Sequence, residues 1–527
     1  MFKRIASALL LALAAQGVCA QNAWTKSAYN LVSKTYKDTY ETKADSMTYS
    51  FVQTFMNKQK GVFNATYNQY AFNAYWQQAH YIDVVIYNYQ RHKGVDTKNT
   101  SLFLNYIKLW YKNKGNNWEG TAAASSTTPN TSTGYKMFEN GFIDDMCWVT
   151  LTMLHVAEAT GTASYATVAR QIFDNYIITE AREDETTGGL WLAQKQDAGK
   201  DAGVSACTQS PATLIAAKLY QRFGTEKYLE YAKKFYAYAS KKMVKSDYRV
   251  EEPPLSYTQG TFAEACRILF HVTDEASSKK TSYKNMAYQY LNYAFTSSRC
   301  TSGGILRSEG TDGNQSLFKA VLIPYAVNFV LDDDMQTTYR TTILKLIMKN
   351  TTTLWPKMDF TRYPSKVFCN YIWSSPWSGE DSEASCGAMC SGASLIENTA
   401  RMCRAITDRY TLGSLITECS KLTIEPGHAD DADLTAYHKA LAEAQEIMEA
   451  PGSYTTANFQ KAIANLQEAL PAAQDYATRI DNAGISEEEN TAGIYTLDGR
   501  LVRSAWQGTA GLPRGIYVVG RRTVQVP

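Results

Sequence analysis

The stretch Gly161-Thr162-Ala163-Ser164-Tyr165 returns as Gly224-Thr225-Glu226-Lys227-Tyr228, and Thr281-Ser282-Tyr283 is a weaker third copy. The tyrosines that end the three copies stand 63 and 55 residues apart. Each copy begins a segment with apolar residues at three- and four-residue spacing, and another such segment ends just before it. Two helices of about 15 residues with their connections fit that period, so the repeating unit is a helical hairpin.

The helical pattern runs from residue 28 to about residue 410. At the period of the repeat, this length holds about six or seven hairpins, which is more than a simple bundle contains. The hairpins could stack into an open solenoid or close into a toroid of six, the (α/α)6 barrel. Irregular insertions rich in Gly and Trp favour the toroid, because such loops would line a cleft at one end. The sequence therefore predicts an all-α domain over residues 21–420.

Two smaller parts follow this domain. Residues 427–484 contain helical periodicity in 434–448 and 459–470, and they resemble the FIVAR-type modules of secreted glycan-active proteins; a plain helical spacer is the alternative. Residues 485–527 change to period-two patterns around the Asp498-Gly499 turn, which predicts a short β tail. This tail resembles the C-terminal sorting modules of secreted Bacteroidetes proteins.

The first twenty residues have the features of a secretory signal peptide. A basic start at Lys3-Arg4 precedes the apolar run 5–15, and small residues precede the expected cleavage after Ala20. Lipid attachment at Cys19 is the less favoured alternative. No later run of about 20 apolar residues predicts a membrane span. We therefore expect an exported protein that is periplasmic, displayed on the cell surface or extracellular.

Nine cysteines remain after that cleavage, an odd number that leaves at least one thiol unpaired. Several lie in helical patterns, where Cys behaves as a small apolar residue. Cys386 and Cys390 are spaced like a metal or redox pair, but no second pair and no nearby His supports that interpretation. We expect a structural disulfide somewhere in residues 369–419.

The overall composition excludes several classes of protein. Lys and Arg number 53 and Asp and Glu 51, so the net charge of +2 argues against a nucleic-acid partner. The six His show no metal-ligand spacing, which argues against a zinc hydrolase and a His-based triad. No cofactor or metal is expected, and the chemistry must come from carboxylates, Tyr or Cys. The 36 Tyr and 10 Trp either bind flat, hydroxylated ligands or pack the hairpins together.

The adjacent acids Asp144 and Asp145 stand at a predicted helix start between Phe142 and Trp148. Acids in this position often only cap the helix. However, neighbouring helix positions differ by about 100°, so two adjacent carboxyls can converge on one point. Retaining glycosidases place two carboxyls about 5–5.5 Å apart, as nucleophile and acid/base. Proximity also raises the pKa of one carboxyl, which then keeps its proton near neutral pH.

Four segments in order carry a family resemblance. They are 142–148, Gly188-Gly189-Leu190-Trp191, 255–262 around Tyr257-Thr258-Gln259-Gly260, and Asp312-Gly313 followed by Phe318-Lys319. Together they resemble family 76 glycoside hydrolases, the endo-α-1,6-mannanases. The resemblance implies an (α/α)6 toroid that cleaves α-1,6-mannosidic bonds of mannan with retention, with Asp144 as nucleophile and Asp145 as acid/base.

The resemblance also implies a set of residues that bind the polysaccharide. We expect sugar contacts from Trp148, Trp191, Tyr257, Gln259, Asp312 and Lys319. Turn packing is an equally good explanation for Trp191. Departures from the family pattern at Thr258, at Ala320 and in 205–210 lie where substrate is held, so the linkage or subsite preference could differ.

Two rival functions stay open at this point. One is another glycosidase, or a polysaccharide lyase, on the same toroid. The other is a non-catalytic glycan-binding surface protein that keeps the fold. The leading hypothesis is a secreted, monomeric, endo-acting α-mannanase whose partner is α-mannan. Whether linear or branched mannan is preferred stays open.

Overall fold

The computed structural model describes residues 24–33, 37–67, 75–112, 138–180, 188–192, 203–251, 253–274, 276–311, 314–361, 366–380, 383–422, 432–478, 493–506, 508–519 and 522–526. The predicted signal peptide and Asp312 lie outside these ranges. The chain divides into two compact units, and the larger one comprises residues 22–410 with 450–459. Among the described residues, no helix is long and apolar enough to cross a membrane.

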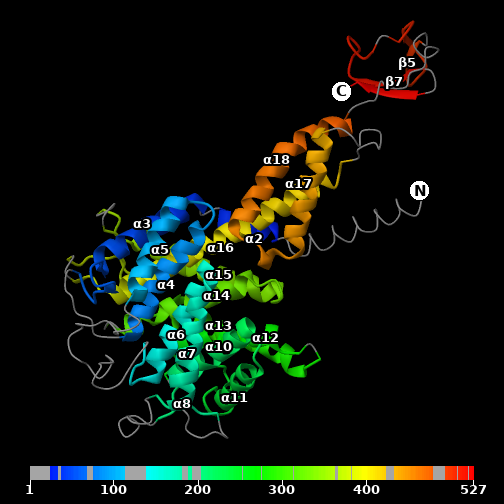
Figure 1. Ribbon diagram of the computed structural model, residues 1–527. Coiled ribbons are helices and arrows are strands. Elements are labelled where there is room, and N and C mark those ends of the chain that lie inside the picture. Colours follow the sequence, from blue (N-terminus) through cyan, green and yellow to red (C-terminus); the bar gives the residue numbers. More distant parts are fainter. Residues whose placement is uncertain are drawn as a thin grey trace. The chain divides into compact units, whose positions relative to one another are not determined.

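Six inner helices of the larger unit form a closed ring. Each of them is labelled in Figure 1. They are α4 (Tyr75–His92), α6 (Ile143–Thr160), α10 (Ala206–Phe223), α12 (Ser256–Val272), α14 (Phe318–Leu331) and the first part of α16 (Cys386–Cys419). Each of the first five contacts the next. Helix α16 closes the ring, because Ser394 Oγ donates to the α14 carbonyl of Ala320 at 2.8 Å and Cys390 Sγ donates to the α4 carbonyl of His80 at 3.4 Å.

A second layer of helices surrounds this ring. Five outer helices follow their inner partners: α5 (Thr97–Tyr111), α7 (Ala163–Ile172), α11 (Glu226–Lys242), α13 (Ser278–Thr296) and α15 (Thr337–Leu354). The sixth is α3 (Lys37–Phe55), from the start of the chain, which binds α16 through the hydrogen bond from Thr48 to Glu397. Both ends of the domain thus complete the last hairpin. The predicted all-α (α/α)6 toroid is confirmed.

Shorter elements connect these hairpins. They are α2 (Lys26–Ser33), the π-helix η2 (Phe173–Ile177), α8 (Ile178–Glu180), the 3₁₀ turns η4 (Gln315–Leu317) and η5 (Trp355–Lys357), and two small antiparallel pairs, β1 (Met56–Asn57) with β2 (Val62–Phe63) and β3 (Thr301–Ser302) with β4 (Ile305–Leu306).

The repeated tyrosines join neighbouring hairpins. Tyr165, near the start of α7, is buried with its ring 4.7 Å from that of Tyr111 on α5. Tyr283, near the start of α13, is likewise buried, 5.2 Å from Tyr236 on α11. Gly161 ends α6 with a φ of 76°, a backbone conformation that glycine adopts at no steric cost. The repeat therefore marks packing positions, as one of the two explanations of the Tyr content predicts.

The expected disulfide in residues 369–419 is wrong, because all nine cysteines of the described chain are free thiols. Cys390 donates instead to the carbonyl of His80, and Cys369 Sγ lies 3.5 Å from the carbonyl of Ala388. Cys386, Cys390 and Cys403 are fully buried on α16. These thiols fill the core as small apolar residues, and those of Cys369 and Cys390 donate weakly to backbone oxygens.

The smaller unit includes residues 411–449 and 460–527, which make up most of the two C-terminal parts. Helices α17 (Ala432–Glu449) and α18 (Thr456–Thr478) flank the turn η8 (Pro451–Ser453) and include the two predicted helical segments. A four-stranded antiparallel sheet of order β6-β5-β7-β8 follows, made by β5 (Ile494–Thr496), β6 (Leu501–Arg503), β7 (Gly515–Val519) and β8 (Arg522–Val526). Ile494, Trp506 and Tyr517 belong to its buried core. The FIVAR-like and sorting roles, and the domain boundaries, stay predictions.

Candidate active site

The two acids lie in the first turn of α6. Phe142 is the N-cap residue, so Asp144 and Asp145 are the second and third residues of the helix. The backbone around them is held from outside: Asn140 Oδ1 accepts from the N–H of Phe142 at 2.8 Å, and the N–H of Ile143 donates to the carbonyl of Leu192 at 2.7 Å. This second bond brings the turn that contains Trp191 to the start of α6.

The environments of the two carboxyls differ. Asp145 is buried, with 7% of its surface exposed, whereas Asp144 is half-buried. Burial raises the pKa of Asp145 well above its usual range, and the nearby charge of Asp144 raises it further. Asp145 is thus the member of the pair that holds a proton toward neutral pH, as an acid catalyst must.

Five rings form a closed aromatic cluster beneath the acids. Trp76, His80, Trp148, Tyr257 and Phe318 contact one another in a cycle with centroid distances between 4.4 and 5.8 Å. They come from α4, α6, α12 and α14, close to the first turns of these helices. Because Trp148 follows Asp144 by one helical turn, the aromatic cluster lies directly below the acidic pair.

Two further carboxyls occupy the starts of α10 and α12, and the sequence analysis did not find them. Glu251 accepts the N–H of Ala206 at 3.0 Å, and its backbone is left-handed with a φ of 63°. Glu309 accepts the N–H of Ser256 at 2.6 Å as well as the Ser256 hydroxyl. Burial raises the pKa of both carboxyls, that of Glu309 to about 7.

These contacts follow one rule around the ring. A loop that precedes an inner helix reaches back to the start of the inner helix before it. Leu192 does so for α6, Glu251 for α10, Glu309 for α12, and Tyr371, whose carbonyl accepts from Lys319 Nζ at 2.7 Å, for α14. The bonds span 45 residues or more, so local sequence patterns carry no signal for them.

Sequence comparison assigns the family. The profile of Glycosyl hydrolase family 76 matches residues 35–405, which is most of the chain. The chain belongs to glycosyl hydrolase family 76. It is therefore a glycoside hydrolase. No curated protein matches the chain.

Solved structures with the same fold include other family 76 proteins. An inactive variant of an α-1,6-mannanase of Salegentibacter sp. HEL1_6, in complex with α-1,6-mannotetraose, is 21% identical over 69% of this chain and 99% of its own, with a TM-score of 0.56. A family 76 mannosidase of Bacteroides thetaiotaomicron VPI-5482 is 16% identical over 70% of this chain and 99% of its own, with a TM-score of 0.53. At these identities the likeness shows the toroidal fold.

Two of the expected sugar-binding residues of this family 76 chain keep free surface. Trp191 is half-buried and forms an isolated bridge with Val204 opposite the start of α10. Tyr257 has 8% of its surface exposed, and within the described chain its hydroxyl makes no hydrogen bond. Its pKa is raised well above the usual range, first by burial and then by the charges of Cys207, Asp144, Glu251 and Glu309. Tyr257 thus stands among the carboxyls.

Three other residues that are expected to contact sugar are buried in the structure. Gln259 is fully buried, and its amide binds the backbone of Tyr248, Val250 and Tyr290, so it fixes a loop and has no free group for a sugar. Lys319 is fully buried against the carbonyl of Tyr371. Trp148, 2% exposed, belongs to the aromatic cluster. These side chains pack beneath the surface of the candidate site and hold its loops and rings in place. Asp312 lies outside the described residues.

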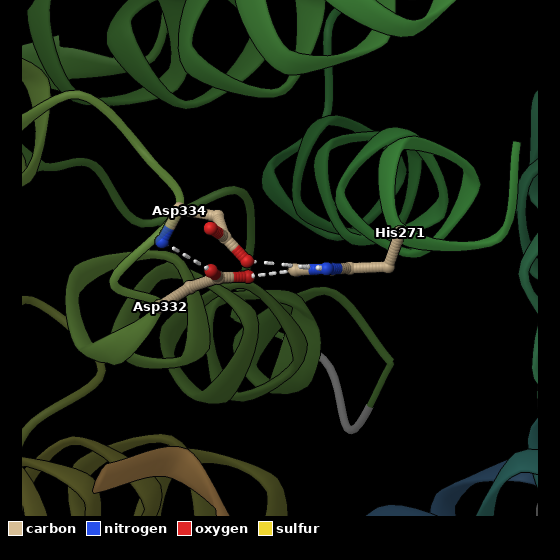
Figure 2. Close-up of side chains that lie close together, drawn as sticks. All are labelled: His271, Asp332 and Asp334. Carbon is tan, nitrogen blue, oxygen red and sulfur yellow. Dashed lines mark hydrogen bonds and ion pairs between the residues drawn. The ribbon is translucent and has the colours of Figure 1, made fainter. Parts of the chain in front are cut away.

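The opposite end of the ring carries a different charged cluster (Figure 2). Ligand atoms of His271, Asp332 and Asp334 lie within 4.8 Å of one another, as a metal site would require. However, Arg267 Nη1 donates to Asp332 Oδ2 at 2.7 Å, and His271 Nε2 lies 2.6 Å from the same oxygen. A cation would have to displace this arginine. His271 follows Tyr257 by fourteen residues on α12, about 21 Å along the helix, so the cluster is not part of the candidate site.

A charged pocket of about 530 Å³ also lies at that opposite end, where α4 finishes. Its charges are paired with one another. Arg404 binds Glu41, and Arg91 binds Asp45 and also Glu397. The acidic pair of α6 is not among the lining residues.

Proposed function

We propose that this protein is an exported, endo-acting, retaining α-1,6-mannanase. The single observation that carries the proposal is the first turn of α6, where a half-buried Asp144 precedes a buried Asp145 of raised pKa. This arrangement supplies one ionised carboxylate and one protonated carboxyl in adjacent positions, which is what hydrolysis with retention uses.

The proposed reaction has two steps. The Asp144 carboxylate attacks the anomeric carbon and forms a glycosyl ester, while Asp145 gives its proton to the departing glycosidic oxygen. Asp145, now ionised, takes a proton from water, the water oxygen attacks the anomeric carbon, and Asp144 leaves as carboxylate. Because the first step needs protonated Asp145, activity should fall as the pH rises through the pKa of Asp145.

The solved relatives support the substrate. The inactive Salegentibacter mannanase variants carry substitutions at two consecutive aspartates and hold α-1,6-mannotetraose or α-1,6-mannotriose. Within residues 35–405 of this chain, consecutive aspartates occur at Asp144-Asp145 and at 332–334. Arginines already bind Asp332 and Asp333 in the second run. The pair on α6 is therefore the counterpart we propose.

Reducing-end release from linear α-1,6-mannan tests the proposal. The wild-type protein should release oligosaccharides of mixed length, as an endo-acting enzyme does, and NMR should show the α-anomer of the product first. Asp334→Asn serves as a matched control, because the Asp334 side chain is 68% exposed at the opposite end of the ring. Ultraviolet-absorbing products would instead indicate a lyase, and mannan binding without release would indicate a non-catalytic protein.

Export is a separate part of the proposal. The basic and apolar start of the chain supports cleavage after Ala20. N-terminal sequencing of protein recovered outside the cytoplasm should begin at Gln21. Recovery with Met1 intact would contradict export through this segment.

A further inference from the structure

Glu309 joins a distant loop to the first turn of α12. It follows β4, and its two carboxylate oxygens accept the backbone N–H and the hydroxyl of Ser256. Ser256 is the first residue of α12 and is 2% exposed. Leu255, the N-cap residue, makes no side-chain cap bond. Glu309 therefore supplies, from outside, the acceptor that the start of this helix lacks.

Tyr257 is the next residue of the helix, and its ring has a fixed position in the aromatic cluster. The centroid of the ring lies 4.4 Å from that of Phe318 and 5.7 Å from that of Trp148. Trp148 connects it to the acidic pair one turn earlier on α6. The direction of the Tyr257 side chain follows the backbone of the first turn, so a shift of Ser256 would move the hydroxyl relative to Asp144.

A buried lysine lies beside Phe318, the ring that contacts Tyr257. Lys319 follows Phe318, lies with Nζ 4.1 Å from the centroid of Trp373, and donates to the carbonyl of Tyr371. Burial lowers the pKa of Lys319 to about 7 and raises the pKa of Glu309 to about 7, and the attraction between the charged forms of the two side chains opposes both shifts. The backbones that carry Tyr257 and Phe318 are thus held by two neighbouring side chains, Glu309 from the loop that precedes α14 and Lys319 from the first turn of α14.

We propose that Glu309 is a positioning residue of the active site. Through Ser256 it holds Tyr257 so that the tyrosine hydroxyl, which no other described residue binds, meets the sugar beside Asp144 and Asp145. This inference rests on the proposed function for its substrate. It differs from a general capping role because its effect must pass through Tyr257.

A double-mutant cycle measures that coupling, with α-1,6-mannotetraose as the substrate. Glu309→Ala and Tyr257→Phe should each lower kcat/KM by roughly tenfold or more, since small misplacements of positioning groups have effects of that size. If Glu309 acts only through Tyr257, the double variant should show the same loss of kcat/KM as Tyr257→Phe alone. A double variant whose loss is the product of the two single losses would overturn the proposal.

Two further variants separate positioning from folding. Glu309→Gln keeps an acceptor for the Ser256 N–H, so it should restore kcat/KM to within about threefold of the wild-type value. Asp96→Ala is the matched control, because Asp96 Oδ1 accepts the N–H of Asn99 at 3.0 Å at the start of the outer helix α5. It should lower Tm without changing kcat/KM. Equal losses in Glu309→Gln and Glu309→Ala would contradict the proposal.

A readout without substrate keeps this inference distinct from the proposed function. Fluorotyrosine placed at position 257 should give one sharp ¹⁹F resonance in the wild-type and Glu309→Gln proteins, and a shifted or broadened one in Glu309→Ala. An unchanged resonance in Glu309→Ala would overturn the positioning role, even if the mannanase is active. If mannotetraose is not cleaved at all, the proposed function fails, and the resonance alone decides the role of Glu309.

Discussion

The pKa values of the buried acids shift in opposite directions at the two ends of the inner helices. At the starts, the pKa values of Asp145, Glu251 and Glu309 are all raised by burial, and no Arg binds these carboxyls in the described chain. At the opposite end, burial also acts to raise the pKa of Asp332, but His271 and Arg267 outweigh it and hold that pKa below its usual range. Glu264, halfway along α12, shows the same balance, because Arg267 holds its pKa below the usual range despite burial. Acids that are paired with Arg stay ionised, whereas acids whose pKa values are raised by burial can hold and release protons near neutral pH, which suits them to catalysis.

The largest expected effect is the loss of turnover when either acid of the pair at the start of α6 is replaced. Asp144→Asn and Asp145→Asn should each lower kcat on linear α-1,6-mannan by about 10³-fold or more, because each removes a group that forms or breaks bonds. Circular dichroism and Tm should stay close to the wild-type values. Near-normal turnover by either variant would contradict the assignment of catalysis to the helix starts.

Substitution at the opposite end should act on stability instead. Arg267→Ala leaves the buried carboxyls of Glu264 and Asp332 without their main cation, which should cost about 3–5 kcal/mol of unfolding free energy. Urea unfolding measures this loss, and kcat/KM per folded molecule should not change. If Arg267→Ala lowered kcat/KM without lowering stability, the active site would not lie at the starts of the inner helices, contrary to this account.

A smaller effect concerns the pH dependence of stability. The pKa of Glu309 is about 7 in the folded protein and near its ordinary value of 4.5 when unfolded, so the folded state binds more protons between these values. The protonated Glu309 therefore contributes on the order of 1–3 kcal/mol to the free energy of unfolding. This contribution is complete below about pH 4.5 and is lost as the pH rises through about 7. Glu309→Gln should flatten the decline of unfolding free energy over this range. An identical slope in the variant would contradict the raised pKa.

The smallest effect is expected from reductant. Since all nine thiols are free, dithiothreitol should change Tm by less than about 1 °C, whereas the loss of a disulfide typically costs 2–5 kcal/mol. Thiol titration of the unfolded, unreduced protein should count nine groups. A lower count would restore the disulfide that the sequence analysis expected.

The sequence predicts the parts of this structure that depend on local patterns. The repeat with Tyr165 and Tyr283 predicts helical hairpins, the Gly- and Trp-rich insertions between them favour the toroid, and the two adjacent acids predict the first turn of α6. Long-range contacts were missed or misassigned. Gln259 looks like a ligand residue because it stands near a helix start, but its amide is used by backbone groups from a loop and an outer helix. Glu309 gives no local signal, since its partner Ser256 lies 53 residues earlier.

The most direct test of the central claim is to locate the glycosyl-enzyme intermediate. Asp145→Ala protein, given an α-1,6-mannobioside with a good leaving group, should form the ester without needing acid catalysis and hydrolyse it slowly. Mass spectrometry of the quenched protein should then show one added mannobiosyl group, and peptide mapping should place it on Asp144. An adduct on any other residue, or rapid turnover with no adduct and an inverted product, would contradict the account.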